Sequence, residues 1–309
     1  MRRAVLDVGS NSVLTLVAEW KLGAWHTVGE TSAVTGLGRG TKESGILTEQ
    51  AMADTLAAIK TGFDWARENG ATEILAGGTM ALRIARNTAE FLGRAQAQGT
   101  PVRLVSGEEE AELGFLAVAD DPTFQGVDRL SIVDPGGHST ELVTAVRNAS
   151  GEWETVFKKS YSVGALGLAE GPMHEESPGI AARLRTASAL DDLIGLDYLP
   201  LAAGQTIVLG ATGTNLVSIR ESMVTWQSER VHGAWLDYEE ISRAVAWMCE
   251  MTEAQRRAIP GIELGRERTL HIGALILERF LQKLHVLGCT VSVRGWRHAL
   301  LEREFAPAV

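Results

Sequence analysis

Residues 130–143 contain the pattern that most constrains how this chain can fold. They read LSIVDPGGHSTELV, in which an apolar run ends at Asp134, two glycines follow, and a second extended run leaves through Glu141. This order predicts a strand, a tight turn and a second strand. Gly136 and Gly137 allow the backbone to approach a ligand closely, and consecutive N–H groups in such a turn can bind an anion. For one such turn taken alone, an ordinary β-hairpin is the alternative.

The same order of residues occurs a second time near the N-terminus. Residues 4–17 read AVLDVGSNSVLTLV, which is again an apolar run, an aspartate, a glycine with hydroxyl side chains, and an apolar run. Internal similarity of this kind indicates two related halves. We therefore expect the two halves to face each other across a cleft, each presenting one loop to the same polyphosphate ligand.

Length, charge and cysteine content narrow the class of protein. The chain has 309 residues, of which 45% are hydrophobic, and this is enough for two domains of ordinary size. Its net charge of −10, without any run of Lys or Arg, argues against a broad nucleic-acid surface. Cys249 and Cys289 match neither a metal site nor a disulfide framework, so free thiols are expected. Because no signal peptide or membrane-spanning stretch is visible, we expect a cytoplasmic protein without a membrane partner.

Two further segments place glycine or acidic residues at the start of predicted helices. Gly78 precedes a helix that carries Arg83, and a glycine turn into a helix N-terminus favours anions. Gly107 begins a helix whose first turn holds three consecutive glutamates, residues 108–110. Acidic residues in a first turn usually complement the helix dipole, but one of them directed into a cleft would be a good general base.

Taken together, these motifs resemble the exopolyphosphatase / guanosine pentaphosphate phosphohydrolase family, a branch of the superfamily of actin, sugar kinases and chaperone ATPases. The matching segments are DVGSNS from Asp7, GLGRG from Gly36, GTMALR from Gly78, GEEEAEL from Gly107, DPGGHSTE from Asp134, GATGTNL from Gly210 and VHG from Val231. The resemblance implies an α/β fold with two ribonuclease H-like (actin-like) domains, each a mixed sheet flanked by helices, and an interdomain cleft. It places the N-terminal domain at 1–124, joined by a C-terminal helix at 297–309, and the C-terminal domain at 125–296.

The resemblance also assigns chemistry to individual residues. Glu110 stands at the position of the catalytic base, which would orient and deprotonate the water that attacks the terminal phosphorus. Asp134 and Glu141 are expected to act in catalysis near Mg²⁺, or another divalent cation, and to be its ligands. The residues expected to bind phosphate are Asp7, Ser10, Asn11, Arg83, Gly136, Gly137, His138, Ser139, Thr140, Gly210, Thr212, Gly213 and Thr214.

Three positions depart from the pattern of the family. His138 stands where the family usually has a third glycine, so it adds a bulky, titratable side chain beside the phosphate loop. Glu112 replaces a common arginine, and residues 297–299 replace a more usual arginine-glutamate-glycine. His138 could contact phosphate, or it could narrow the pocket and slow turnover.

The leading hypothesis is a magnesium-dependent phosphohydrolase that removes the terminal phosphate from inorganic polyphosphate or from guanosine pentaphosphate. One alternative is a catalytically weak sensor of the same fold that binds polyphosphate or the guanosine penta- and tetraphosphate alarmones. A third reading is an ATP-dependent kinase of the wider superfamily, which would transfer phosphate to an acceptor other than water. No nucleic-acid partner is expected, and a homodimer is one option for assembly.

Overall fold

The computed structural model describes residues 1–119, 121–195 and 203–306, and the chain divides into two compact units. Unit 1 consists of Met1–Ala117 together with the C-terminal stretch that begins at Trp296. Unit 2 consists of Val118–Gly295. The predicted C-terminal helix of the first domain is present, although residues 307–309 of that prediction lie outside the described residues.

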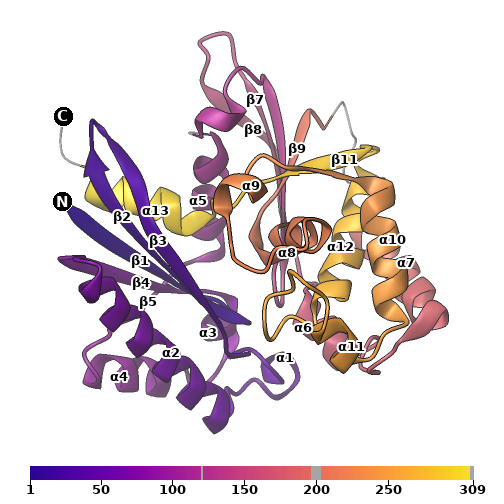
Figure 1. The fold of residues 1–309 in the computed structure, drawn as a ribbon, viewed down its shortest axis with the longest axis horizontal. Coiled ribbons are helices and arrows are strands. Elements are labelled where there is room, and N and C mark those ends of the chain that lie inside the picture. Colours follow the sequence, from indigo (N-terminus) through magenta and orange to yellow (C-terminus); the bar gives the residue numbers. More distant parts are fainter. Residues whose placement is uncertain (120, 196–202, 307–309) are drawn as a thin grey trace. The chain divides into compact units, whose positions relative to one another are not determined.

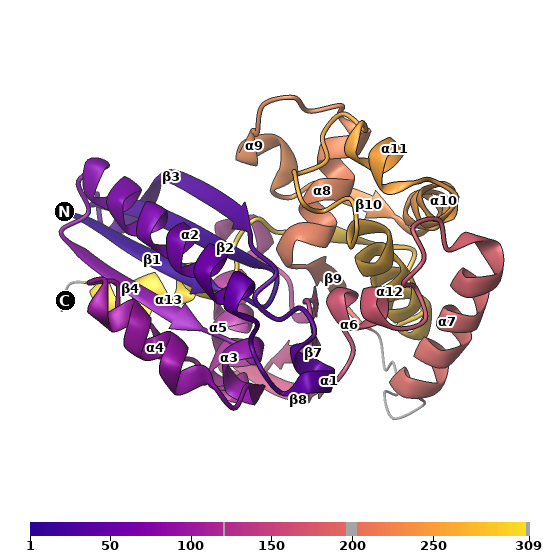
Figure 2. The ribbon, with the colours of Figure 1, turned by 90° about the horizontal axis from the view of Figure 1, so that it is seen from below.

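Unit 1 is a five-stranded sheet with the strand order β3-β2-β1-β4-β5. Its elements are β1 (Arg2–Val8), β2 (Ser12–Lys21), β3 (Ala24–Val34), α1 (Thr41–Ser44), α2 (Glu49–Glu68), β4 (Glu73–Gly78), α3 (Met80–Ile84), α4 (Thr88–Ala97), β5 (Arg103–Leu104), α5 (Gly107–Ala119) and α13 (Trp296–Phe305). The pairs β1–β2 and β2–β3 are antiparallel, whereas the pairs β1–β4 and β4–β5 are parallel. Helices α2 and α4 lie on one face of this sheet and α13 on the other (Figures 1 and 2).

The alternation of side chains along β1 explains why this sheet is covered on both faces. Leu6 and Val8 belong to a core cluster that includes residues of α2, whereas Val5 belongs to a cluster that includes Trp296 and Leu300 of α13. Successive residues of a strand point to opposite faces, so a continuous apolar run needs a partner on each side. The C-terminal helix is therefore part of the core of unit 1.

Unit 2 is a six-stranded sheet with the order β10-β11-β9-β6-β7-β8. Its strands are β6 (Arg129–Pro135), β7 (Thr140–Arg147), β8 (Trp153–Tyr161), β9 (Gln205–Val208), β10 (Trp235–Asp237) and β11 (Gly288–Val291). Its helices are η1 (Pro122–Phe124), α6 (Ala165–Glu170), α7 (Gly179–Ile194), α8 (Gly210–Arg220), α9 (Ser228–Val231), α10 (Tyr238–Cys249), α11 (Glu253–Arg257) and α12 (Leu270–Lys283). Nearly all of α12 is buried, and it packs against β6, α7 and α10 (Figure 1).

The two sheets repeat one topology. In each, three consecutive strands form an antiparallel meander, and the next strands join the first one in parallel on its other side. Thus β6, β7, β8, β9 and β11 correspond in order to β1, β2, β3, β4 and β5. The prediction of two α/β domains with mixed sheets flanked by helices is confirmed, and the repeated loop motif belongs to a repeated fold.

The first boundary between the units falls after residue 117, whereas the sequence prediction divided the chain after residue 124. The difference concerns the segment around η1. Phe124 is buried and its ring contacts His232 of unit 2 edge to face, with 5.6 Å between ring centroids. Tertiary contacts of this kind decide to which unit a connecting segment belongs, and the sequence pattern does not contain them.

Among the helices of the described residues, none combines the length and the apolar character that a bilayer crossing would require. The two cysteines, Cys249 and Cys289, are buried and free.

The docking of α13 onto unit 1 can be tested at Gly77. A Cβ atom there would lie 2.7 Å from both Trp296 Cη2 and Val105 Cγ2, so Gly77→Ala should lower the free energy of unfolding by about 1–3 kcal/mol through overpacking. Gly93→Ala on α4 is the control, because nothing lies within 4 Å of its Cβ position and alanine favours helices by up to about 1 kcal/mol. Denaturant unfolding measures both, and equal stability of the two variants would contradict this packing.

Candidate functional site

The first loop of the repeat connects β1 to β2 and is fixed by backbone hydrogen bonds. The N–H of Gly9 donates to the carbonyl oxygen of Ser12 at 2.9 Å, and the carbonyl of Asn11 accepts from the N–H groups of Thr35 and Gly36. The Ser10 hydroxyl oxygen accepts from the N–H of Ala81, at the start of α3, at 3.2 Å. Ser10 and Asn11 are both buried. The loop is thereby held rigidly between the end of β3 and the start of α3.

Asp7, at the end of β1, lies in an environment that favours its protonated form. Burial raises the pKa of this carboxyl to about 7, although the charge of Arg297 and a hydrogen bond from the Trp296 side chain act in the opposite direction. Arg297 is itself paired with Glu30 of β3 at 2.5 Å. The helix α13 therefore supplies both groups that support an ionised Asp7, and near neutral pH the carboxyl is close to half-protonated.

Arg83 and Glu110 are brought together as an ion pair. Nη1 of Arg83, on α3, lies 2.8 Å from Oε2 of Glu110, on the first turn of α5, and also donates to the carbonyl oxygen of Val105 at 2.8 Å. Both side chains keep about a fifth of their surface exposed, 21% for Arg83 and 18% for Glu110. A predicted phosphate ligand and the predicted base are thus direct neighbours, and solvent reaches both.

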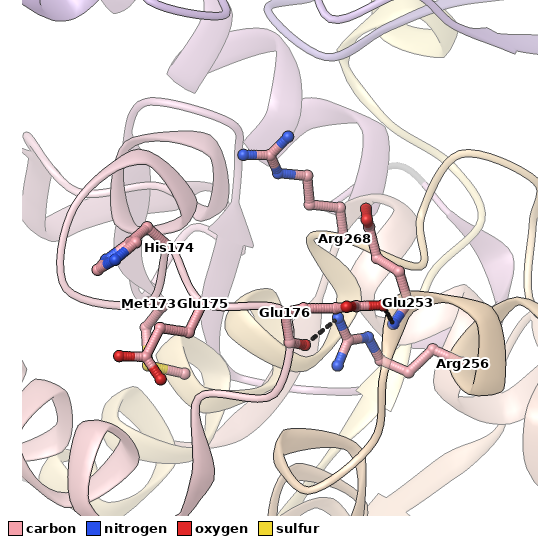
Figure 3. A pocket seen from close by; sticks show the side chains of 7 residues that line it. All are labelled: Met173, His174, Glu175, Glu176, Glu253, Arg256 and Arg268. Carbon is pink, nitrogen blue, oxygen red and sulfur yellow. Dashed lines mark hydrogen bonds between the residues drawn. The ribbon is translucent and has the colours of Figure 1, made fainter.

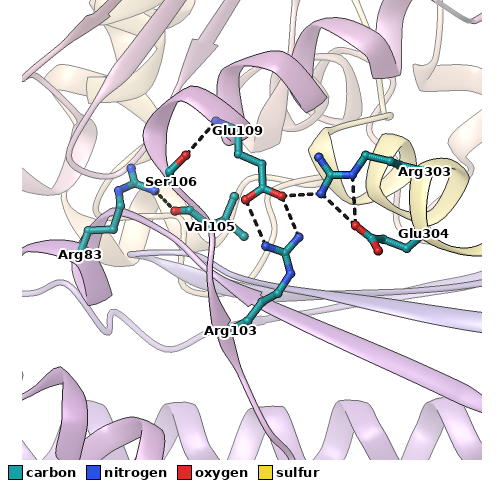
Figure 4. Close-up of polar contacts among 7 residues, drawn as sticks. All are labelled: Arg83, Arg103, Val105, Ser106, Glu109, Arg303 and Glu304. Carbon is teal, nitrogen blue, oxygen red and sulfur yellow. Dashed lines mark hydrogen bonds and ion pairs between the residues drawn. The ribbon is translucent and has the colours of Figure 1, made fainter.

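The neighbouring glutamate, Glu109, has a different environment (Figure 4). It accepts two hydrogen bonds from Arg103, at 2.9 and 3.1 Å, and forms an ion pair with Arg303 of α13. The hydrogen bonds from Arg103, followed by burial in the opposite direction and the contact with Arg303, leave the pKa of Glu109 at about 2. This carboxylate links β5, α5 and α13, so its role is structural, which separates it from Glu110.

In unit 2, the ends of β6 and β7 that flank their connecting turn each place a carboxylate on the same face of the sheet. Asp134 and Glu141 are directly opposite each other in the antiparallel register. Side chains at opposed positions project to the same side, with Cβ atoms about 4.5–5.5 Å apart. Both residues are half-buried, and the Ser160 hydroxyl of β8 donates to Oε1 of Glu141 at 2.8 Å. The turn closes with the N–H of Gly136 donating to the carbonyl of Ser139 at 2.9 Å.

Carboxylate oxygens in this arrangement fit a hard divalent cation. Among the described residues, no group of three or more His, Cys, Asp and Glu side chains forms a ready-made metal site. A cation held by Asp134 and Glu141 would therefore complete its shell with water and substrate phosphate oxygens, which is how Mg²⁺ is usually bound.

The turn after β6 is held in place by the start of α6. The N–H of Ala165 donates to the carbonyl oxygen of Gly136 at 3.0 Å, and the N–H of Leu166 donates to that of Gly137 at 2.8 Å. Gly164 precedes these residues, and a Cβ atom there would lie 2.3–2.4 Å from backbone atoms of Gly137 and His138. Sequence reasoning missed Gly164, because nothing in its local pattern shows which loop lies against it.

The polar residues that follow in this loop are directed inward. His138 is 1% exposed, Ser139 6% and Thr140 0%, and the Thr140 hydroxyl donates to the carbonyl of Val163 at 2.8 Å. Gly136 and Gly137 remain partly accessible. The backbone of the two glycines, and not the side chain of His138 or Thr140, is therefore the accessible part of the turn.

The third glycine motif forms the N-terminus of α8. Gly210 has a φ of 76°, and a Cβ atom there would lie 3.0 Å from Oδ1 of Asp134. Gly213 packs against Val208, Thr212 is buried, and the Thr214 hydroxyl donates to the carbonyl of Ala211 within α8. Leu209, at the N-cap position, makes no side-chain capping hydrogen bond. The N-terminus of α8 and the Asp134 carboxylate are neighbours through Gly210.

The predicted site residues thus form two sets. Asp7, Ser10, Asn11, Arg83 and Glu110 belong to unit 1, and the residues of the 134–141 and 210–214 segments belong to unit 2. Within each set the structure gives the loop and helix ends that the motifs predicted. The predicted roles in binding, catalysis and metal coordination remain predictions.

A pocket elsewhere in unit 2 contains none of the predicted site residues (Figure 3). It measures about 180 Å³ and is lined by residues 173–176, Glu253, Arg256 and Arg268. Arg256 is 1% exposed and donates to backbone carbonyl oxygens, among them those of Glu176 at 2.9 Å and Met248 at 3.0 Å. Its guanidinium therefore joins these segments of unit 2 and has a structural role.

Comparison with known proteins gives consistent matches along the chain. The sequence model of the Ppx/GppA phosphatase family matches residues 16–306. Exopolyphosphatase 2 of Mycobacterium tuberculosis is 27% identical over 299 residues, covering 92% of this chain and 91% of the relative. Exopolyphosphatase 1 of Mycobacterium bovis is 26% identical over 313 residues, covering 98% of this chain and 88% of the relative.

Solved structures agree with these matches. The Aquifex aeolicus member of the Ppx/GppA protein family superposes with a TM-score of 0.79 at 27% identity, covering 98% of this chain and 97% of that one. An exopolyphosphatase from Cytophaga hutchinsonii gives a TM-score of 0.85 at 22% identity, covering 97% and 96%, and it bears on the fold alone. The predicted actin-like fold is confirmed.

The protonation of Asp7 predicts a pH-dependent difference in stability. With its pKa raised from 3.8 to about 7, the folded state holds a proton that the unfolded chain has released, so stability falls as pH rises through this window. Asp7→Asn lacks this titration. In chelator-treated protein, the stability of the variant relative to wild type should therefore increase from pH 4 to 7 and stay constant above pH 7. A difference that does not vary with pH would contradict the environment assigned to Asp7.

Proposed function

The chain belongs to the Ppx/GppA phosphatase family, and we propose that it releases the terminal phosphate of inorganic polyphosphate, or of guanosine pentaphosphate, by attack of a water that Glu110 activates. The observation that carries this proposal is the ion pair of Arg83 with Glu110 at 2.8 Å. It joins a cation suited to phosphate with a carboxylate suited to deprotonate water.

The ion pair also suggests how substrate could prepare the base. A carboxylate that accepts from a guanidinium offers fewer lone pairs to water. Phosphate oxygens compete well for arginine, because charge-assisted contacts to phosphate are strong. In the proposed mechanism, the terminal phosphate draws Arg83 away from Glu110, and the released carboxylate then binds and deprotonates the attacking water.

The groups of unit 2 have complementary roles in this proposal. In the Gly136–Gly137 turn, the N–H of Gly137 would bind phosphate oxygens, because the N–H of Gly136 donates to Ser139 and closes the turn. The backbone N–H groups at the N-terminus of α8 would bind phosphate oxygens as well. Asp134 and Glu141 would hold Mg²⁺, which supplies charge neutralisation at the transferring phosphoryl group when it is bound. His138 is buried in this turn, so its proposed contribution is to the shape of the phosphate loop.

Polyphosphate is the better supported of the two substrates. The Mycobacterium relatives are named as exopolyphosphatases. Because the chain has a net charge of −10, either polyanion must be held by a local site. Guanosine pentaphosphate shares the terminal phosphate and stays within the proposal. The two buried, free thiols are consistent with the cytoplasm, where we propose that the protein acts.

The catalytic base can be tested against its neighbour. Glu110→Gln should lower the rate of phosphate release by about 10²–10⁴-fold with little loss of substrate binding, because the amide cannot take a proton. Glu109→Gln is the matched control: it should lower stability through its contacts with Arg103 and Arg303 but keep turnover close to wild type. Single-turnover kinetics distinguishes the two, and retained hydrolysis in Glu110→Gln would rule out this base.

The metal role of the unit 2 carboxylates predicts a second effect. Asp134→Asn should raise the Mg²⁺ concentration needed for half-maximal activity at least about ten-fold, because a ligand charge is lost. Ser160→Ala removes only the hydrogen bond to Glu141, so its effect should be smaller. Titration of activity with Mg²⁺ measures both variants. Unchanged magnesium dependence in Asp134→Asn would show that this carboxylate is not a metal ligand.

A further inference from the structure

The chain passes between the two units twice, and polar contacts within unit 2 join the segments next to both crossings. The crossings lie between Ala117 and Val118 and between Gly295 and Trp296. Asp121 follows the first crossing closely and Arg294 precedes the second. Nε of Arg294 lies 3.6 Å from Oδ2 of Asp121, although the two residues are far apart in sequence.

His232, from the VHG motif, takes part in the same cluster. Its Nε2 lies 3.2 Å from Oδ2 of Asp121 and 2.9 Å from the Thr123 hydroxyl oxygen. Its Nδ1 accepts from the N–H of Val293 at 3.4 Å, so the neutral ring carries its hydrogen on Nε2, facing Asp121 and Thr123. The imidazole therefore contacts both connecting segments at once.

Asp121 is buried among groups that favour the charged form of its carboxylate. It is 3% exposed, and its Oδ1 accepts from the N–H of Thr123 at 2.9 Å. Burial alone would raise its pKa, but the contact of Oδ2 with His232 at 3.2 Å, the hydrogen bond from the N–H of Thr123 and the charge of Arg294 hold the pKa below the ordinary value. A buried charge of this kind is kept only where its partners compensate for the lost hydration, so removing one partner should weaken the whole cluster.

We propose that Asp121, His232 and Arg294 form a clamp that ties both interunit connections to unit 2, and that they are positioning residues for phosphate hydrolysis. The second part rests on the proposed function. The first connection follows directly from α5, whose first turn carries Glu110, and the second leads directly into α13, which contributes to the environment of Asp7. The clamp would then steady the end of α5 and the start of α13, and through them these two carboxyl groups.

Hydrogen exchange and kinetics on the full chain test both parts. Asp121→Asn and Arg294→Met each break the clamp from one connection only, and Arg294→Lys keeps the charge. We expect Asp121→Asn and Arg294→Met each to speed amide hydrogen exchange in residues 121–128 and also in residues 289–295. Arg294→Lys should speed this exchange less. Asp191→Asn is the control, because it breaks a carboxylate–guanidinium pair with Arg279 elsewhere in unit 2. Exchange that rises only in the connection carrying the substitution, or no more than in the control, would overturn the clamp.

Kinetics tests the positioning role separately. In Asp121→Asn and Arg294→Met, kcat should fall about 10- to 100-fold with a change in KM, since small misplacements far from the chemistry have effects of this size. Arg294→Lys should restore much of the rate. A purely structural role would lower the thermal midpoint and leave kcat and KM of the folded protein unchanged, and that result would overturn positioning. If wild type releases no phosphate, the proposed function and the positioning role fail together, and exchange still decides whether the clamp exists.

Discussion

The antiparallel pairing of β6 with β7 is the interaction on which the unit 2 half of the proposed site depends. Its register sets Asp134 opposite Glu141, which places two carboxylates on one face beside a glycine turn. A register shift of one residue would turn both side chains to the other face. The contact of α6 with Gly136 and Gly137, for which Gly164 leaves room, holds the turn in the conformation that keeps this register. The same meander in unit 1 places Asp7 at the corresponding strand end.

Local pattern was sufficient to predict these loops, because strand period and glycine turns are properties of short segments. It could not separate Glu109 from Glu110, which are neighbours with the same side chain. What distinguishes them is Arg303, which comes from the end of the chain and pairs with Glu109, leaving Glu110 beside Arg83. The buried position of His138 was not predictable for the same reason: the sequence shows that it departs from a glycine, but not what packs around it.

Electrostatic environment then differentiates carboxylates that composition treats alike. Burial raises the pKa of Asp7 to about 7, whereas the contacts with Arg103 and Arg303 lower that of Glu109 to about 2. Both environments depend on α13, whose residues Trp296, Arg297 and Arg303 contribute to them. The last helix of the chain is therefore needed for the packing of unit 1 and for the charge state of its first loop.

The proposed function requires that this member of the family transfers phosphate to water. The most direct measurement is phosphate release by wild-type protein with magnesium in isotopically labelled water, using short polyphosphate, long polyphosphate, guanosine pentaphosphate and ATP. We expect release from polyphosphate or guanosine pentaphosphate, with the label incorporated into the released phosphate. Release from none of the four, combined with thermal stabilisation by one of them, would contradict it and identify a binding protein instead.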